Sequence, residues 1–439
     1  MSKYDTYKET DVIWFKELPA HWKRKRVKDV TQTLAGGTPD TSKEEYWEGS
    51  IPWLPSGKVQ NSIINEEDAD TFITEEGLKN SATKMLPAPA TLIALTGATC
   101  SNIGYLTFNA CANQSVVGMP GSSKMLPKFL FYTLQSQKEQ ILLHQTGGAQ
   151  GGISESDVKF LFIPVPIESE QLTIANYLDD QTQKIDRLIA NKKAQAEKLK
   201  ELRQIEINNA VTKGLNPNAE MKDSGIEWLG EIPKHWEVKR LKNVANYIQT
   251  GITPPSENSD YYDGEIPWYG PGGFNGETIL SNPAKYITQK AIDDNEAKLF
   301  PVNCVFMIGI GATIGKVGII KEPSSCNQQL NIINFKSFVN PDFGVYFLKI
   351  YESVIINIAN FSTLPIYNQV QTGNLKFLLP PKKEQDEIFD YLQKRTTAID
   401  QLIKNIEAQI EKLQELRKIK IYEAVTGKIK VNAYAETTA

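Results

Sequence analysis

The sequence predicts an internally duplicated α+β protein, in which two strand-rich domains are separated by two long helices that pair as an antiparallel coiled coil. The stretch from Glu170 to Gly214 recurs without a gap from Glu384 to Lys428. Both copies of this stretch have helical periodicity, and short apolar runs between glycines and prolines precede each copy. A repeat of this length indicates a duplicated domain rather than a solenoid of small repeats.

The duplication divides the 439 residues into five expected parts. They are a first strand-rich domain over 1–166, a central helical spacer over 167–214, a second strand-rich domain over 215–381, a distal helical spacer over 382–430 and a tail over 431–439. Each strand-rich domain is long enough to bury a core of its own.

Each copy opens on an aromatic turn with the pattern W-x-x-E-[LI]-P-x-H-W, which ends at His21-Trp22 and at His235-Trp236. The large rings of this turn are expected to clamp the start of each domain by their burial. A catalytic histidine needs a nucleophile or a carboxylate partner, and no such partner is fixed nearby in both copies. A packing or turn role is therefore favoured for both histidines.

A basic segment follows each aromatic turn. Its members are Lys23, Arg24, Lys25, Arg26 and Lys28 in the first copy, and Lys239, Arg240 and Lys242 in the second. The net charge of −4 gives no global sign of nucleic-acid affinity, so any such affinity must be local. A solvated surface is the alternative role of these segments.

Short strands are expected between each basic segment and each long helix. Gly36–Pro39 and Thr250–Pro254 are glycine and proline turns that punctuate them. The apolar runs Thr91–Leu95 and Cys304–Ile308 lead into Gly-Ala-Thr in both copies, which is typical of hairpin strands around a glycine turn. Short helices, such as 127–140, complete each domain.

The repeated stretch has the periodicity of a long helix in both copies. Apolar residues occupy heptad a and d positions, namely Leu178, Ile185, Leu188, Leu199 and Leu202, and then Leu392, Ile399, Leu402, Ile406, Leu413 and Leu416. The parts 182–212 and 396–426 span about 46 Å at about 1.5 Å per residue. Two copies related by a twofold run antiparallel along one seam, which favours pairing over two helices that pack separately.

Composition excludes several classes of protein. Hydrophobic residues make up 41% and charged residues 23%, which are globular values. The four cysteines show no C-x-x-C spacing, so neither a zinc site nor a disulfide scaffold is expected. The start of the chain lacks a signal peptide and no stretch reaches 18 apolar residues, so a cytoplasmic protein is expected.

No enzyme motif has the spacing that its chemistry needs. Gly309–Lys316 has the appearance of a phosphate loop, but its glycine spacing is wrong and Val317 follows the lysine. No Asn or Asp precedes Pro-Pro and an aromatic, as expected for a methyltransferase acting on a base amino group. Glu237-Val-Lys239 resembles the end of a nuclease motif, yet the first copy has lysines there. The sequence therefore predicts no catalytic site.

The chain closely resembles the specificity subunit of type I restriction-modification enzymes over essentially its whole length. The resemblance is carried by Thr212–Asn218, Met221–Trp236, Pro380-Pro381-Lys-Lys-Glu384-Gln385, Gly-Ala-Thr-Ile-Gly with Asn-Gln, and Ala424–Lys428. Only Pro164-Val-Pro166 of the first copy departs from the Pro-Pro pattern.

This resemblance implies a non-catalytic chain. Each strand-rich domain is then a target recognition domain for one half of a bipartite double-stranded DNA site. The helices set the spacing and carry two modification subunits, and restriction subunits join through the complex. No cofactor is expected on this chain, whereas S-adenosylmethionine, ATP and Mg are expected on the partner subunits.

The duplication separates expected backbone contacts from expected base contacts. Residues shared by both copies are expected to be scaffold or phosphate contacts, and reading residues are expected where the copies differ. Asn113-Gln114 and Asn327-Gln328 are shared, so a turn or scaffold role is favoured over a bidentate contact with adenine.

Two stretches that differ between the copies are the candidates for base reading, Ser56–Asn61 against Tyr269–Asn275 and Gln145–Gln150 against Asn360–Pro365. Mobile loops without any contact are the alternative. The predicted DNA-binding residues are Lys23, Arg24, Lys25, Arg26, Thr38, Lys58, Gln60, Asn61, Gln150, Lys239, Arg240, Thr253, Asn275, Ser362 and Thr363.

Two other classes of function stay open at this point. A self-sufficient nuclease or methyltransferase would turn over substrate as the purified chain alone. A two-headed adaptor for protein or sugar would bind DNA no more strongly than charge-matched controls.

Overall fold

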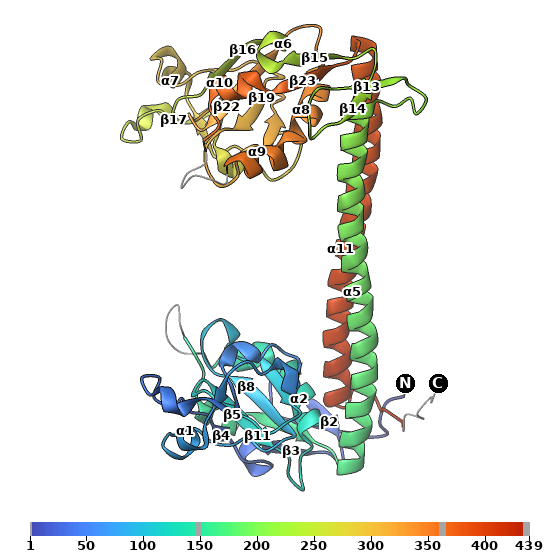
Figure 1. The fold of residues 1–439 in the computed structure, drawn as a ribbon. Coiled ribbons are helices and arrows are strands. Elements are labelled where there is room, and N and C mark those ends of the chain that lie inside the picture. Colours follow the sequence, from blue (N-terminus) through green and yellow to red (C-terminus); the bar gives the residue numbers. More distant parts are fainter. Residues whose placement is uncertain (1, 146–150, 360–365, 433–439) are drawn as a thin grey trace. The chain divides into compact units, whose positions relative to one another are not determined.

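The computed structural model describes residues 2–145, 151–359 and 366–432. These residues divide into two compact units, and each unit contains one strand-rich domain with parts of both long helices. Unit 1 comprises Met1–Lys193 and Glu407–Ala439, and unit 2 comprises Ala194–Ile406. The chain is α+β and internally duplicated, as predicted (Figure 1).

Unit 1 is built around a five-stranded sheet of order β4-β11-β8-β9-β6 beside a three-stranded sheet of order β10-β5-β7. The strands are β1 (Tyr7–Glu9), β2 (Glu17–Pro19), β3 (Lys23–Arg26), β4 (Leu34–Ala35), β5 (Trp47–Leu54), β6 (Ile63–Ile64), β7 (Phe72–Ile73), β8 (Ala90–Ala94), β9 (Ile103–Leu106), β10 (Cys111–Ala112), β11 (Val116–Pro120) and β12 (Phe162–Val165). The helices are α1 (Glu75–Lys79), α2 (Pro127–Ser136), α3 (Lys138–Leu142), α4 (Glu155–Phe160) and the start of α5 (Glu168–Lys213).

Unit 2 repeats this arrangement with a four-stranded sheet of order β16-β22-β19-β20 and a three-stranded sheet of order β18-β17-β21. The strands are β13 (Met221–Asp223), β14 (Glu231–Pro233), β15 (Glu237–Arg240), β16 (Ala245–Thr250), β17 (Tyr262–Tyr269), β18 (Lys285–Ile287), β19 (Val305–Ile308), β20 (Val317–Ile319), β21 (Ser325–Cys326), β22 (Leu330–Phe335) and β23 (Lys376–Leu379). The helices are α6 (Leu241–Val244), α7 (Gln289–Asp293), α8 (Pro341–Lys349), α9 (Tyr351–Ala359), α10 (Gln369–Asn374) and α11 (Lys382–Val425).

The expected hairpin around each Gly-Ala-Thr turn is confirmed. All five residues of β8 are buried, and β8 pairs antiparallel with β9 across the turn at Gly97–Thr99. The four residues of β19 are buried and pair with β20 in the same way. Continuous apolar runs form these strands because both of their faces are covered by side chains.

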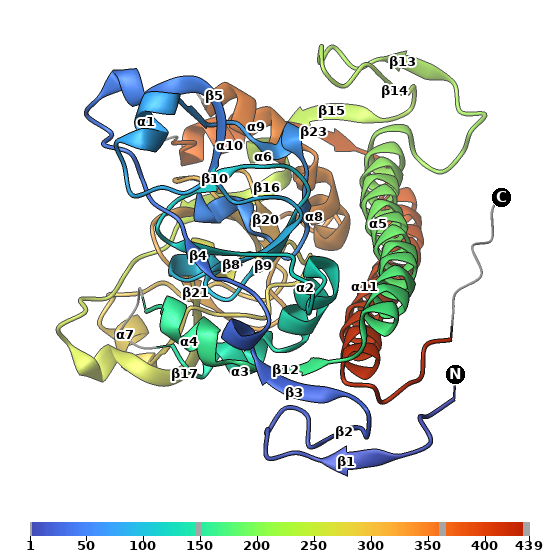
Figure 2. The ribbon, with the colours of Figure 1, turned by 90° about the horizontal axis from the view of Figure 1, so that it is seen from below.

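The predicted antiparallel coiled coil is confirmed within each unit. In unit 1 the first part of α5 lies beside the last part of α11, and the Asp186 carboxylate is 3.0 Å from the Arg417 guanidinium. In unit 2 the last part of α5 lies beside the first part of α11, and the Arg203 guanidinium is 2.8 Å from the Asp400 carboxylate. Both views show α5 and α11 side by side (Figures 1 and 2).

Part of the predicted seam is wrong. Leu188, Leu202, Leu402 and Leu416 are exposed, by 50%, 37%, 51% and 40%. The covered positions of α5 instead recur at steps of three and four, through Thr182, Ile185, Ile189, Lys192, Ala196, Leu199 and Arg203. Three of these covered positions hold the polar residues Thr182, Lys192 and Arg203, so the spacing of apolar residues alone does not mark the seam. The exposed leucines belong to a neighbouring stripe of the helix.

Candidate nucleic-acid interface

Unit 1 has a face of uncharged loops at the end of β8. We define the loop face of unit 1 as residues 36–39, 96–99, 113–115 and 151–153. The Thr38 hydroxyl donates to the Gln114 side chain, and the Thr96 hydroxyl donates to the Ser115 hydroxyl at 2.8 Å. Thr96 also pairs with Gly152 in an isolated antiparallel bridge, which joins the last loop to the others.

Unit 2 has the same loop face, made by residues 251–254, 310–313, 327–329 and 366–368. The Thr253 hydroxyl donates to the Gln328 side chain at 2.6 Å, and Ile310 pairs with Ile366 in the bridge equivalent to that of unit 1. The Tyr367 amide donates to the Gly309 carbonyl at 2.7 Å, which closes the face.

Glycine is required where two of these loops cross. A Cβ on Gly36 would lie 2.2 Å from the Asn113 carbonyl oxygen, and one on Gly251 would lie 2.0 Å from that of Cys326. None of the residues in either loop face is Asp, Glu, Lys or Arg. Such a face offers amide, hydroxyl and backbone groups without the repulsion that a carboxylate would exert on a phosphate.

The predicted residues Thr38 and Thr253 lie on these loop faces, where Thr38 is half-buried and Thr253 is exposed. Their hydroxyl hydrogens are used by the neighbouring glutamines. Each hydroxyl therefore retains its oxygen as an acceptor, while the glutamine amide retains its NH2 as a donor. This pairing holds Gln114 and Gln328 in equivalent positions in the two units.

In the first predicted reading stretch of unit 1, the side chains of Lys58, Gln60 and Asn61 all contact other residues of unit 1. Lys58 forms an ion pair with Asp70 at 2.7 Å, and the Gln60 side chain donates to the Gly57 carbonyl at 2.7 Å. The Asn61 side chain accepts from the Ile103 amide at 3.0 Å and donates to Asn102 at 3.0 Å. The backbone of Asn61 has a positive φ of 59°, a conformation that asparagine adopts more readily than most other residues. This conformation explains why an asparagine stands at this position of the turn.

The equivalent Asn275 of unit 2 accepts a hydrogen bond from the Glu277 amide at 3.1 Å. It lines a hollow that is also lined by Arg203 of α5 and Asp400 of α11. The remaining predicted residues Gln150, Ser362 and Thr363 lie outside the described residues.

The predicted basic residues of unit 1 lie on a separate two-stranded ribbon of β3 and β12, at the start of α5. The guanidinium carbon of Arg24 lies 4.6 Å from the centre of the Phe162 ring, and Arg24 also pairs with Asp11. Arg26 and Lys28 lie over the Phe160 ring at 5.5 and 4.0 Å. Lys23 and Lys25 are exposed on the same strand.

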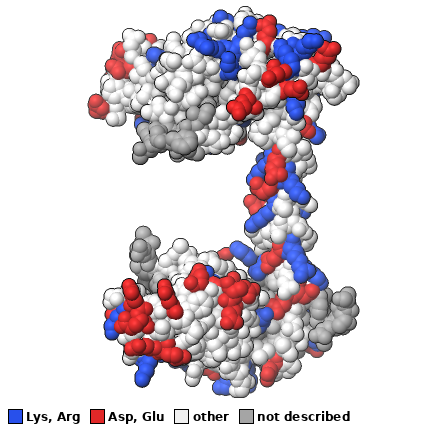
Figure 3. All heavy atoms as spheres, in the orientation of Figure 1, with Lys and Arg blue, Asp and Glu red and all other residues white. Residues whose placement is uncertain are grey.

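The predicted DNA-binding residues Lys239 and Arg240 of unit 2 lie on the matching ribbon of β15 and β23, and Lys242 lies in α6. Lys239 pairs with Glu237 at 2.5 Å, and Arg240 is exposed opposite Lys376. Lys and Arg side chains gather over the part of unit 2 where Figure 1 labels β15 and α6 (Figure 3). Both ribbons are thus positive surfaces formed by strands outside the main sheets.

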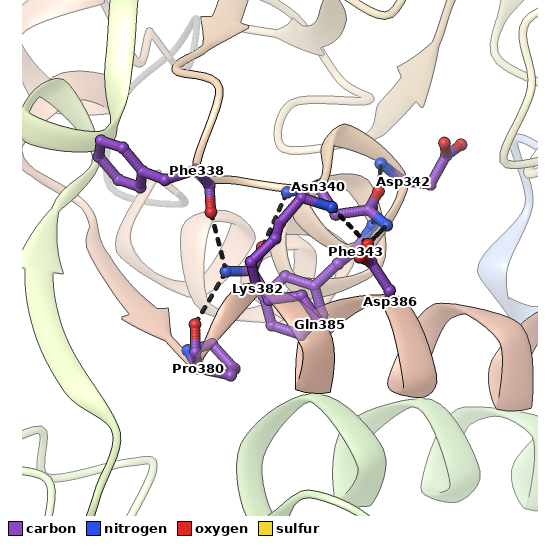
Figure 4. Close-up of polar contacts among 8 residues, drawn as sticks. All are labelled: Phe338, Asn340, Asp342, Phe343, Pro380, Lys382, Gln385 and Asp386. Atoms are coloured by element: carbon purple, nitrogen blue, oxygen red, sulfur yellow. Dashed lines mark hydrogen bonds and ion pairs between the residues drawn. The ribbon is translucent and has the colours of Figure 1, made fainter.

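A buried glutamine holds the start of each long helix to its unit. The Gln385 side chain accepts from the Asn340 amide at 2.8 Å and donates to the carbonyls of Phe338 at 3.2 Å and Pro380 at 2.8 Å (Figure 4). Gln171 makes the equivalent three bonds, to the Leu126 amide and to the carbonyls of Lys124 and Pro166. The glutamine of the Glu-Gln pair at each helix start is therefore explained by the attachment of the helix to its unit.

The expectation that neither histidine has a carboxylate partner in both copies is wrong. His21 lies 3.0 Å from Glu170, and His235 lies 2.8 Å from Glu384. The partners are 149 residues away in the sequence in both copies, so a local search could not find them, although the repeat itself contains both pairs. These contacts join each aromatic turn to the start of a long helix.

In the ranges that the structure describes, no three His, Cys, Asp or Glu side chains come together in a way that could hold a metal ion. The four cysteines are buried free thiols. Burial raises the pKa of the Cys111 thiol to about 11, which keeps it protonated and unreactive.

A family model described as the type I restriction modification DNA specificity domain matches residues 19–198 and again residues 233–412. The chain belongs to this family. The starts of the two matches, Pro19 and Pro233, are as far apart in the sequence as Glu170 and Glu384 of the internal repeat.

Two proteins that are similar to this chain are named as specificity subunits of type I restriction enzymes. The MjaIX specificity subunit of a type I restriction enzyme from Methanocaldococcus jannaschii is 25% identical over 97% of this chain and 96% of its own length. The EcoR124I/EcoR124II specificity subunit from Escherichia coli is 25% identical over 52% of each chain. Specificity subunits are the DNA-recognition components of these complexes and do not carry catalysis.

Solved structures show the same fold. A chain from work on the assembly and conformational transition of a type I restriction-modification system superposes with a TM-score of 0.73 at 17% identity, covering 94% of this chain and 99% of that one. A specificity subunit from Thermoanaerobacter tengcongensis gives a TM-score of 0.52 at 17% identity, over 94% and 98%. Within the described ranges, none of the helices has the length and apolar character needed to cross a membrane.

Proposed function

We propose that the two units read the two halves of a bipartite, asymmetric DNA site. The observation that carries this proposal is a loop face of the same construction in both units, bordered by residues that differ. Gln114 and Gln328 are held alike by a threonine, whereas Thr96 and Gly152 of unit 1 are replaced by Ile310 and Ile366 of unit 2. A shared scaffold with unlike borders favours two readers of different sequence.

In this proposal the target recognition domains are residues 1–166 and 215–381, and the helical spacers are 167–214 and 382–430. The basic ribbons and the threonines of the loop faces contact phosphates, which position the DNA without reading it. The residues of the stretches that differ contact base edges.

Domain exchange tests the assignment of one half-site to each unit. Residues 30–160 are replaced by the corresponding segment of a relative that has a different methylation motif. We expect one half-site to change and the other to stay, because each unit has its own core and its own loop face. Sequencing of the methylated motif reports both half-sites at once, and a change in both would show that the units read jointly.

We propose further that the helices set the spacing of the half-sites and carry two modification subunits. α5 is one continuous helix that begins in unit 1 and ends in unit 2, and α11 does the reverse. Each unit has an equivalent set of exposed apolar helix residues, Leu188, Leu416 and Ile419 in unit 1 and Leu402, Leu202 and Ile205 in unit 2. Exposed apolar stripes of this kind favour a protein partner.

Two equivalent surfaces on one polypeptide predict two modification subunits for each specificity subunit. S-adenosylmethionine, ATP and Mg belong to the partner subunits in this assignment, and restriction subunits join through them. Such a complex acts on chromosomal DNA, so we place the protein in the cytoplasm. Native mass spectrometry of the co-purified complex checks the ratio, and saturation at one modification subunit would contradict it.

A further inference from the structure

Three equivalent positions differ in a consistent way between the units, two on each loop face and one in the short helix that follows it, α4 or α10. Unit 1 has Thr96, Gly152 and Ser156, whereas unit 2 has Ile310, Ile366 and Val370 at the equivalent positions of the repeat. The bridges between Thr96 and Gly152 and between Ile310 and Ile366 confirm that these positions correspond in the structures. Unit 2 therefore has an apolar patch where unit 1 has small or polar residues.

The apolar patch of unit 2, defined as Ile310, Ile366 and Val370, is accessible. Ile366 is 52% exposed and Val370 is 72% exposed. The three side chains border a hollow of about 310 Å³. Side-chain amides complete the wall of this hollow, and no residue that lines it carries a charge.

The polar groups of the hollow are oriented by unit 2 itself. The Gln369 side chain donates to the Thr250 hydroxyl at 3.1 Å, and the Lys298 ammonium donates to the Thr250 carbonyl at 3.2 Å. A cation close behind the surface and the lack of carboxylates on it both suit a polyanionic ligand. A patch of three side chains is also far smaller than a standard protein interface, which covers about 800 Å² on each partner.

We propose that this apolar patch contacts the C5-methyl group of a thymine in the major groove of the half-site read by unit 2. Thymine is the one base that presents a methyl group there, and apolar side chains are its usual contact. This inference rests on the proposed function, since it assumes that unit 2 reads DNA with its loop face. Unit 1 has no such patch, so its half-site is read without this contact.

Deoxyuridine provides the test, because it differs from thymidine only by the C5-methyl group. The full chain is assembled with its modification subunits, and the methylation motif is mapped first. Binding is then measured to duplexes in which each thymine of either strand in the unit 2 half-site is replaced singly by deoxyuridine. We expect one replacement to weaken binding about fourfold, the loss of one buried methyl group.

The variants Val370→Ala and Ile366→Ala connect this effect to the patch. Both side chains are exposed, so the fold is expected to tolerate the changes. In the double variant we expect equal affinity for thymidine and deoxyuridine at the sensitive position. Val302→Ala, which shortens an exposed valine elsewhere in unit 2, is the matched control and should keep the difference.

The inference is overturned if no thymine in that half-site is sensitive, or if the sensitivity persists in the double variant. Loss of modification-subunit binding with unchanged sensitivity would instead make the patch a protein contact and would also overturn it. Domain exchange separates this failure from failure of the proposed function. If exchange of 245–375 alters one half-site and deoxyuridine has no effect, only the thymine contact is wrong.

Discussion

The buried glutamine at each helix start is the residue on which the attachment of helix to domain depends. Gln385 is fully buried and satisfies one backbone N–H and two backbone carbonyls. Replacement by alanine leaves these groups without partners in a place that water does not reach. We expect Gln385→Ala to lower the free energy of unfolding of unit 2 by about 2–4 kcal/mol.

Urea denaturation followed by circular dichroism measures this loss. Gln414→Ala, on the exposed surface of α11, is the matched control and should change stability by less than about 0.5 kcal/mol. Equal effects of the two substitutions would contradict the anchoring role of Gln385.

Lys349 is a half-buried cation whose counterpart in unit 1 is neutral. Its ammonium donates to the Gly276 carbonyl at 3.2 Å and to the Thr278 hydroxyl at 2.9 Å. Burial, with a smaller contribution from the nearby Arg203 guanidinium, lowers the pKa of Lys349 to about 8. Gln135, the equivalent residue, donates to the Asn61 carbonyl at 2.9 Å without any charge.

This lowered pKa predicts a stability that depends on pH. Between about pH 8 and the unfolded-state pKa of about 10.4, the unfolded chain holds more protons, so the contribution of Lys349 to stability rises with pH. Below about pH 8 the cost of partly desolvating the charge is fully present. We therefore expect Lys349→Gln to stabilise unit 2 by about 1–2 kcal/mol at pH 7, with the gain fading toward pH 10.4.

Denaturation midpoints at pH 7 and pH 10 check the sign of this effect. Lys383→Gln, at a lysine that is 91% exposed, should give no pH-dependent difference. A Lys349→Gln variant that is less stable than the native chain at pH 7 would show that the two hydrogen bonds outweigh the cost of burial.

Asn61 shows how far residue roles can be predicted from this sequence. The sequence makes it a candidate reading residue because it lies in a glycine-containing stretch that differs between the copies. The structure gives its side chain two partners within unit 1, at Ile103 and Asn102, and both are remote in sequence. Composition and turn signals predict where a polar side chain occurs, whereas its partners depend on tertiary packing.

At the scale of elements, the two stripes on each long helix have different roles. The seam includes Ile399, which is buried, and the neighbouring stripe includes Leu402, which is half exposed. We expect Ile399→Asn to lower stability by about 3 kcal/mol or more, because it places an amide without partners in the seam. Leu402→Asn should cost less than about 1 kcal/mol but weaken binding of a modification subunit.

Thermal unfolding and co-purification with the modification subunit measure these two effects separately. Equal losses of stability in both variants would place Leu402 in the seam after all. Full retention of the partner by Leu402→Asn together with the equivalent Leu188→Asn would remove the exposed stripe as the docking surface.

The two stripes also explain what periodicity could and could not predict. The existence and the antiparallel pairing of the two helices follow from the repeat and the heptad spacing, and both are confirmed. The helices are longer than the predicted parts 182–212 and 396–426, since α5 has 46 residues and α11 has 44. The exact seam does not follow, because Lys192 and Arg203 occupy covered positions while leucines occupy exposed ones. Long cationic side chains can cover a seam with their aliphatic stems, so residue type alone does not mark the buried face.

At the scale of the whole molecule, most of the architecture that could be predicted follows from the internal duplication. One constant offset along the sequence relates the helices, the aromatic turns, the anchoring glutamines and the ion pairs of the seam. The same offset, found in the sequence alone, shows that one structural framework occurs twice in the chain. The recognised sequence does not follow from it, because in our proposal the base contacts are made by residues that the two copies do not share.

The continuity of the two helices leads to the last prediction, which concerns the gap between the half-sites. The part of α5 over 182–212 spans about 46 Å, which corresponds to about 13 base pairs at about 3.4 Å each, so the half-site centres are expected about one turn of DNA apart, with unread pairs between them. Inserting four residues after Gln195 and four after Gln409 adds close to one helical turn, or about 6 Å, to both helices.

The elongated protein should methylate sites whose unread gap is longer by one or two base pairs, while each half-site stays the same. Four residues exceed a full turn by about 40°, so a local stutter and some loss of stability are expected alongside. Methylation-motif sequencing of the variant measures the gap directly, and an insertion after Gln195 alone, which mismatches the two helices, is the control expected to lose activity. If the doubly elongated chain still methylates only the original spacing at undiminished efficiency, the partner subunits and not the helices set the distance.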